Sequence, residues 1–316
     1  MCIKERNTSD STCKKLLRDK GCFADLCNYA FFQGRQVIQP EELVSRENDL
    51  STLIGKVDKP TEIKRYRDVV RKASIHGEYV IIGVEHQSTF DEKMIFRILN
   101  YDATIYINQV ESKQEVYPVG SFVFYTGDKE WKSPETLKET LKNIPPEMEP
   151  YINDWRLPVV ELKTMDARKL TNQRLKEIVE ISQSMFAGNY DDLRNNRKIE
   201  TENFMMAATF TRTKIKREDL PEGDEINMCE AMDRLFQRFE NQGIEKGKSD
   251  TLKEQLKVKL GTLSRPLEKQ LTNTSLEKLN ELTLNIFNVT NEDDVLRIIN
   301  WVCQEKCVSN LNITKK

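Results

Sequence analysis

Two acidic residues and a glutamine, Asp68, Glu85 and Gln87, are the side chains of this sequence whose types and spacing best suggest chemistry. Glu85 and Gln87 follow the short apolar run 79–84, which is typical of a buried strand. Alternate residues of a strand share a face, so Glu85 and Gln87 project together, roughly 6.6 Å apart along the strand. His86 then points to the opposite face, where we expect a core or supporting position.

Asp68 meets Glu85 if the segment between them folds as a tight hairpin. With a two-residue turn at 76–77, counting outward along both strands brings Asp68 directly opposite Glu85. A four-residue loop centred on the same point keeps this register, whereas a three-residue loop places the two carboxylates on opposite faces. The register is therefore a hypothesis that the backbone can test.

Two carboxylates opposite each other, with Cβ atoms about 4.5–5.5 Å apart, repel and need a compensating charge. Mg²⁺ supplies that charge well, because it binds carboxylate oxygens and keeps waters for a phosphate group. Such a site can activate water for attack on a phosphodiester. Gln87 can hold the water or a phosphate oxygen by hydrogen bonds, but it is not a base. In the structural alternative, Asp68 pairs with a neighbouring basic residue and Glu85 caps the next helix.

The elements that must position these residues alternate between strands and helices in the first half of the chain. A polar tail at 1–14 precedes a helical pattern over 16–32, and the spacing of Thr89 and Glu92 predicts a capping box that opens another helix. From about residue 172 the pattern is helical, with a break near 288–291. Apolar runs predict strands over 62–75, 79–84, 117–125 and, at a sheet edge because of its proline, 157–162.

Composition narrows the class of protein. The 316 residues suffice for about two domains, and a net charge of −2 argues mildly against indiscriminate binding of nucleic acid. Seven cysteines without a Cys-x-x-Cys pair, and only two histidines, disfavour a standard zinc site and suit reduced cytosolic thiols. No apolar run is long enough to span a membrane. Two basic clusters are either local nucleic-acid grooves or solvated faces: Lys64, Arg65, Arg67, Arg71 and Lys72, and Arg212, Lys214, Lys216 and Arg217.

The arrangement of Asp68, an apolar strand, Glu85-x-Gln87 and a following helix resembles the PD-(D/E)XK nuclease superfamily. Within it, the chain is most similar to the recombination-promoting nucleases, also called the YhgA-like transposase family. No single motif is specific, but their order and spacing are. They are Phe23-Ala24-Asp25-Leu26 with Asn28, 34–38 before 40–43, Tyr66-Arg67-Asp68-Val69, Gly83-Val84-Glu85-His86-Gln87-Ser88, Met94-x-x-Arg97 with Tyr101-Asp102, Tyr125-Thr126-Gly127 with Trp131, and Asn227-Met228-Cys229-Glu230-Ala231.

The resemblance implies an α/β PD-(D/E)XK core, a mixed central sheet flanked by helices, followed by a helical C-terminal region. It implies a DNA endonuclease of the bacterial cytoplasm that uses Mg²⁺, with Mn²⁺ as a substitute, and is linked to DNA recombination. Asp68 and Glu85 become the metal ligands, and Gln87 takes the place of the superfamily lysine. This departure leaves open whether Gln87 supports full or only weak catalysis. Arg67 stands where the superfamily proline would be, but that proline is often absent, so its loss counts for little.

Other positions have tentative roles. Arg97 and Tyr101 are neighbours on one helix face and could contact a phosphate of the substrate, although a core tyrosine with a buried arginine is an equal alternative. Asp25 is either a further acid near the metal or an ordinary helix-surface residue. We expect three regions: 15–165 as the nuclease-like domain, 166–225 as a helical extension, and 226–305 as a helical region that could support a homodimer.

Two competing functions stay open. The first is a catalytically weak or inactive relative that binds nucleic acid or a protein partner. The second is a phosphodiesterase that prefers RNA, although no RNA-binding module is recognisable in the sequence.

Overall fold

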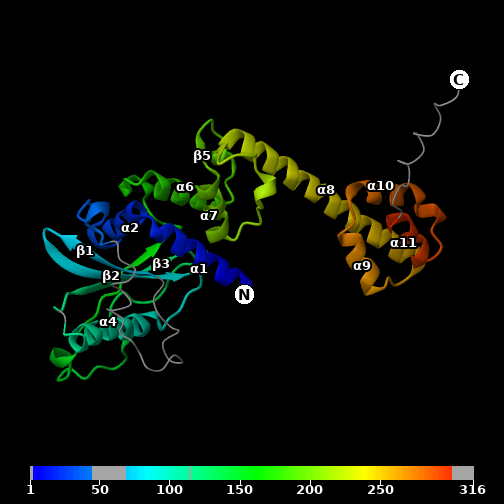
Figure 1. Cartoon of the computed structure of the whole chain (residues 1–316). Helices are drawn as coiled ribbons and strands as arrows, with labels where there is room; N and C mark the ends of the chain where they lie inside the picture. Colours follow the sequence, from blue (N-terminus) through cyan, green and yellow to red (C-terminus); the bar gives the residue numbers. More distant parts are fainter. Residues whose placement is uncertain (1–2, 45–68, 114, 301–316) are drawn as a thin grey trace. The chain divides into compact units, whose positions relative to one another are not determined.

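The computed structural model describes residues 3–44, 69–113 and 115–300, which form two compact units divided after Met232 (Figure 1). The first unit contains a four-stranded sheet with helices, and the described part of the second unit is helical. Among the helices described, none has the length and apolar character that a membrane crossing requires.

The sheet of the first unit has the strand order β1-β2-β3-β4. β1 and β2 are antiparallel, whereas β2 with β3 and β3 with β4 are parallel, so the sheet is mixed. The expected strand at 157–162 is present as a three-residue edge strand, directly after its proline. The strands are β1 (Val69–Ile75), β2 (Glu78–Gln87), β3 (Val119–Tyr125) and β4 (Val159–Glu161).

The β1–β2 hairpin confirms the hypothesis of a two-residue turn. His76 and Gly77 both have positive φ, 53° and 89°, as the type I′ turn favoured in hairpins requires. Ile75 pairs with Glu78, and the register continues unbroken to Val69 opposite Val84. Asp68 itself lies outside the described residues.

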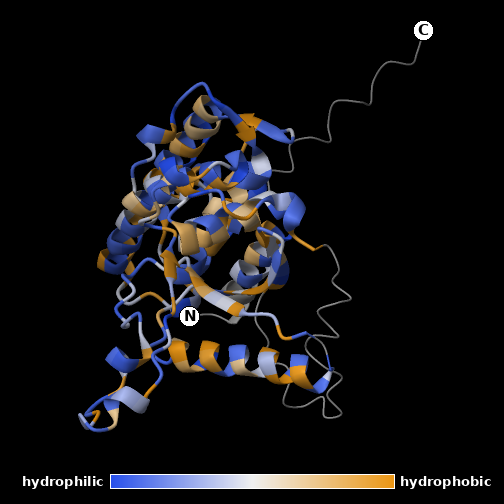
Figure 2. Cartoon of the chain, turned by 90° about the vertical axis from the view of Figure 1, so that its left-hand side faces the viewer, coloured by the Kyte–Doolittle hydropathy of each residue, from blue (hydrophilic) through white to orange (hydrophobic). Residues whose placement is uncertain are grey.

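Helices cover both faces of the sheet (Figures 1 and 2). One face, called here the α4 face, packs against α4 (Met94–Glu111) through apolar side chains of β3. The opposite face packs against helices from both ends of the unit, in the largest hydrophobic core. These helices are α1 (Ile3–Arg18), α2 (Lys20–Phe32), α6 (Gln173–Ala187) and α7 (Thr201–Thr211). The expected mixed α/β architecture is therefore confirmed at this level.

The expectation of a polar tail at 1–14 is wrong over the described residues, because α1 begins at Ile3. Only the end of this helix carries its large apolar anchors, Cys13, Leu16 and Leu17, all fully buried in the core. The first turns lack a hydrophobic stripe, and tertiary packing stabilises a segment whose local pattern is weak.

The capping box at Thr89 is also wrong. α4 begins only at Met94, with Lys93 at the N-cap position. The Asp91 carboxylate accepts a hydrogen bond from the Lys93 backbone N–H and pairs with Arg97 on the helix. These interactions hold 89–93 as a turn instead of a first helical turn.

The remaining elements of the first unit are short. Two three-residue strands pair antiparallel in a separate sheet within the region expected to be almost all helical. They are β5 (Lys198–Glu200) and β6 (Glu225–Asn227), and the other short elements are η1 (Pro40–Glu42), α5 (Leu137–Thr140), η2 (Glu149–Tyr151), η3 (Ala167–Lys169), η4 (Asp191–Leu193) and η5 (Arg217–Asp219).

The second unit has its own core. The long helix α8 (Met228–Leu260) begins in the first unit and continues into the second. The expected break near 288–291 is confirmed, since a short helical turn ends there and the last helix begins at Glu292. The apolar side chains of this core are mostly leucines. The helices are α9 (Arg265–Thr272), α10 (Leu276–Asn285), η6 (Ile286–Asn288) and α11 (Glu292–Asn300).

An ion-pair cluster on α7 makes the stability of the first unit depend on pH. A hydrogen bond from Lys15 lowers the pKa of Glu202, and the charge of Arg174 lowers it further, against an opposing effect of burial. A lowered carboxyl pKa contributes stability at neutral pH that is lost as the pH falls below about 4. Glu202→Gln should therefore lower the free energy of unfolding by less than about 1 kcal/mol at pH 7.

Urea unfolding at pH 7 and at pH 3.5 measures this contribution. The gap between Glu202→Gln and the wild type should close at the lower pH. The exposed residue Glu222 offers the control substitution Glu222→Gln, for which no gap is expected at either pH. A gap for Glu202→Gln that is equally large at both pH values would contradict the assignment.

Candidate active site

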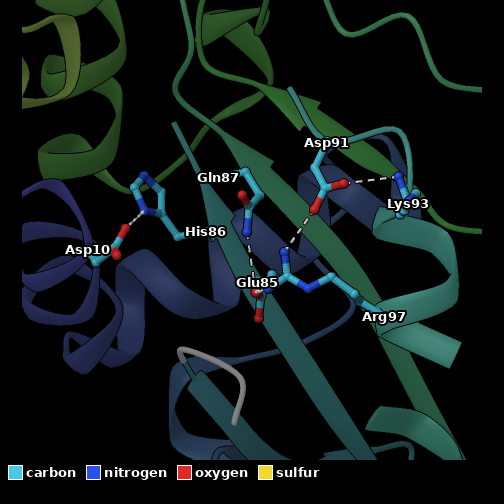
Figure 3. Close-up of polar contacts among 7 residues, drawn as sticks. All are labelled: Asp10, Glu85, His86, Gln87, Asp91, Lys93 and Arg97. Carbon is cyan, nitrogen blue, oxygen red and sulfur yellow. Dashed lines mark hydrogen bonds and ion pairs between the residues drawn. The ribbon is translucent and has the colours of Figure 1, made fainter. Parts of the chain in front are cut away.

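Glu85 and Gln87 lie at the C-terminal end of β2, and both project from the α4 face (Figure 3). Parallel pairing places them beside Val123 and Tyr125 of β3, which belong to the core under α4. Both side chains are buried, with Glu85 only 5% exposed. The strand alternation expected from the sequence is therefore confirmed. It places the Glu85 carboxylate and the Gln87 amide side by side on one buried face of the sheet.

Arg97 of α4 supplies the positive charge that the buried Glu85 carboxylate needs. One guanidinium nitrogen, Nη2, donates to Glu85 Oε1 at 2.9 Å, and the other, Nη1, donates to Asp91 Oδ2 at 3.0 Å (Figure 3). The Gln87 amide Nε2 donates to the same Glu85 oxygen at 3.3 Å. One arginine thus joins two carboxylates, and a charge-assisted bond to each is stronger than a neutral hydrogen bond.

The protonation of Arg97 is secure. Burial lowers its pKa, but hydrogen bonds to Tyr101 and Asp91 and the charge of Glu85 outweigh that effect and raise the pKa above its ordinary value. Tyr101 is half-buried against the core under α4. The structure thus places Arg97 beside Glu85 and Tyr101 beside Arg97. The Arg97 side chain bonds both carboxylates and is still 36% exposed.

Asp91 is the site residue that the sequence argument missed. It lies in the turn before α4, and its apparent place inside a capping box hid its pairing with Arg97. The alternative in which Glu85 caps the next helix is not observed in the described structure, since Lys93 holds the N-cap of α4. Glu161 of β4 pairs with Tyr125, which itself pairs with Gln87, so a further acid lies on the α4 face.

The oxygen atoms at this site are of the chemical type that binds a hard divalent cation. Glu85 and Asp91 offer carboxylate oxygens, the ligands that Mg²⁺ prefers, and they already stabilise a positive guanidinium between them. Within 3–44, 69–113 and 115–300, no group of three or more histidine, cysteine, aspartate or glutamate side chains gathers for a metal ion. The other expected ligand, Asp68, lies outside these ranges.

His86 points away from Glu85, as expected (Figure 3). Its Nδ1 lies 2.9 Å from Asp10 Oδ1 of α1, and its Nε2 lies 2.9 Å from Thr126 Oγ1. The Thr126 backbone N–H donates to the Gln87 carbonyl oxygen at 2.8 Å. The imidazole therefore ties α1 to the ends of β2 and β3 and supports the strand end that carries the candidate site.

Asp25 has a structural role. It is 2% exposed, so the helix-surface expectation is wrong. Its Oδ2 accepts the backbone N–H groups of Thr171 and Asn172, both at 2.9 Å, and Oδ1 accepts from the Gln36 amide. These bonds fix the segment that leads into α6 and use the carboxylate that a metal would have required.

Arg71 and Lys72 of the first basic cluster have structural contacts, whereas the second cluster is an exposed face, as one of the two alternatives expected. Arg71 donates to the carbonyl oxygens of Leu17 and Arg18 at the end of α1, and Lys72 lies over the rings of Tyr79 and Tyr117. Arg217 donates to two backbone carbonyls, and Arg212 donates to the Ser88 carbonyl oxygen just beyond Gln87. Lys64, Arg65 and Arg67 lie outside the described residues.

The cysteines agree with the expectation of reduced, mostly buried thiols. Cys13, Cys22 and Cys27 are buried thiols, and Cys229 is a half-buried thiol. Burial raises the pKa of Cys22 and Cys27 far above the ordinary range, and the charge of Asp19 raises that of Cys22 further. These two thiols are therefore protonated and unreactive.

A mixed sheet with a buried carboxylate and an amide at one strand end is an arrangement shared by many α/β proteins, and the family comparison is more specific. Residues 61–212 match the family described as "Putative transposase, YhgA-like". This match confirms the resemblance to the YhgA-like transposase family and spans β1 to the end of α7. No curated protein and no solved structure matches the chain.

Proposed function

We propose that the protein is a metal-dependent DNA endonuclease of the PD-(D/E)XK type, acting in the bacterial cytoplasm. The observation that carries the proposal is the buried pair of Glu85 and Gln87 on one strand face. The described β1–β2 register, from Ile75 opposite Glu78 to Val69 opposite Val84, agrees with the sequence hypothesis that sets Asp68 against Glu85. The match to a transposase-like family favours DNA as the substrate.

In this mechanism Asp68 and Glu85 would hold Mg²⁺ or Mn²⁺, and Asp91 is a third candidate ligand. The bound cation would act as a Lewis acid toward the phosphodiester and activate a water molecule. Gln87 orients that water or a phosphate oxygen by hydrogen bonds, since an amide both donates and accepts. Arg97, partly exposed beside Glu85, would contact a phosphate oxygen of the bound substrate.

A homodimer suits this function because one active site cuts one strand. The second unit, with a separate leucine-rich core, is the candidate for association between copies.

Cleavage of supercoiled plasmid by the purified protein, with Mg²⁺, Mn²⁺ or EDTA, tests the proposal. We expect nicking with either metal and none with EDTA, together with binding of Mn²⁺ in calorimetry. Absence of both nicking and metal binding would overturn it.

An inactive relative that binds nucleic acid or a partner is the second candidate. It is favoured by glutamine at the superfamily's lysine position and by the 2.9 Å ion pair between Arg97 and Glu85.

Substitution of Gln87 separates the two candidates. In an active enzyme, Gln87→Ala should lower the nicking rate about tenfold, because a hydrogen bond to a reacting group contributes about 1–2 kcal/mol. Gln87→Lys should retain at least wild-type activity, since the lysine ammonium can reach the oxygen that the amide now contacts. Equal rates for wild type, Gln87→Ala and Gln87→Lys would remove Gln87 from the site.

A further inference from the structure

Three aromatic rings lead from the candidate site to the protein surface. Tyr125 pairs with Gln87 across the sheet and is buried. Its ring centroid lies 5.0 Å from that of Trp131, and Trp131 lies 5.2 Å from Phe90, both in edge-to-face geometry. Phe90 is three residues beyond Gln87 and is 41% exposed. The outer end of this series is therefore an exposed aromatic ring. Its neighbour in the chain, Asp91, shares Arg97 with the buried Glu85 carboxylate.

Hydrogen bonds fix the backbone at both Trp131 and the Phe90 turn. The Trp131 backbone N–H donates to Glu161 Oε2 at 3.2 Å, and Glu161 lies on β4 beside Tyr125. The Phe90 turn is fixed in the same way, because Asp91 bonds both Lys93 and Arg97. An exposed ring on a fixed support is unlike a scattered surface apolar residue, since it loses little conformational entropy when a flat ligand stacks on it.

The charged residues around this surface are of both signs. Lys93, Lys129 and Lys132 are exposed nearby, but so are Glu92 and Glu130. Binding that follows the phosphates of a duplex needs a predominantly positive surface. Base stacking needs only an accessible aromatic face and tolerates any base. The surface therefore suits an unpaired base better than an intact double helix.

We propose that Phe90 and Trp131 form a stacking surface for an unpaired DNA base beside Glu85, so that the preferred substrate is single-stranded or locally opened DNA. The choice of DNA rests on the proposed function. Binding of the strand requires neither the metal nor turnover, so it can be measured separately from cleavage.

Fluorescence anisotropy in EDTA, with a labelled oligothymidine and a labelled duplex of equal length, tests the surface in the full chain. Phe90→Ala should weaken binding of the single strand about tenfold, the loss typical of one stacked base, and change duplex affinity less than about twofold. Phe90→Tyr should retain single-strand affinity. Phe287→Ala, which removes an exposed phenylalanine of the second unit, should retain both affinities.

A second measurement reports on Trp131 directly. With Trp155 and Trp301 replaced by phenylalanine, the single strand should quench the remaining tryptophan fluorescence, and the duplex should quench it much less. The proposal would be overturned if Phe90→Ala weakened binding of the single strand and the duplex equally, or weakened neither. It would also be overturned if the wild type did not bind the single strand, or bound an oligouridine more tightly than the oligothymidine. If binding of the single strand depends on Phe90 but no nicking is detected, the stacking surface is supported and the proposed nuclease activity is refuted.

Discussion

Glu85→Ala is expected to lower the rate of metal-dependent plasmid nicking by at least about 100-fold, a loss of roughly 2.7 kcal/mol of transition-state stabilisation. The reason is its position: the carboxylate is 5% exposed, at the end of β2, and is held by Arg97 and Gln87. As a proposed metal ligand it has no substitute on its own strand. Single-turnover nicking in Mg²⁺ and Mn²⁺, with Mn²⁺ affinity from calorimetry, measures the effect.

Loss of folding must be separated from loss of the ligand. Glu85→Gln keeps the shape of the side chain and an oxygen that can accept from Arg97, so it should fold normally and still lose nicking. Glu92→Ala removes an exposed carboxylate from the adjacent turn and should leave the rate unchanged. A folded Glu85→Gln protein with wild-type activity would show that cleavage, if any, takes place elsewhere.

The hairpin that carries this site was predictable because its determinants are local. His76 and Gly77 can both adopt the positive φ of a type I′ turn, and the turn length alone fixes which residues pair. Strand alternation then separates Glu85 from His86 without further information. The family resemblance rests in part on the same region, and the comparison confirms it over residues 61–212.

The charge environment of the site was not predictable in the same way. Thr89 and Glu92 have the local spacing of a capping box, but the ion pair between Asp91 and Arg97 stabilises a turn there instead. The Arg97–Glu85 pair joins a helix to a strand across 12 positions, a separation that no periodicity reveals. The first turns of α1 were missed because their stability comes from packing of Cys13, Leu16 and Leu17.

Arg97→Ala should lower the stability of the protein and raise its affinity for Mn²⁺. A purely structural role of Arg97 would explain only the first effect. The free energy of unfolding should fall by about 1–2 kcal/mol, less than the ~3–5 kcal/mol typical of a fully buried pair, because the side chain is 36% exposed. Affinity for Mn²⁺ should rise about fivefold, because removing a nearby positive charge favours a cation by roughly 1 kcal/mol. Urea unfolding and calorimetry measure the two quantities.

A double-mutant cycle assigns the loss of stability to the contact with Glu85. In the Glu85→Gln background, Arg97→Ala should cost clearly less stability, since no carboxylate charge is left unpaired there. Arg156→Ala, which breaks an exposed ion pair with Glu135, should change stability by less than about 0.5 kcal/mol and leave Mn²⁺ affinity unchanged. Weaker Mn²⁺ binding in Arg97→Ala would mean that the arginine organises the ligands and does not compete with the cation. The ion pair seen in the structure would then be part of the active arrangement.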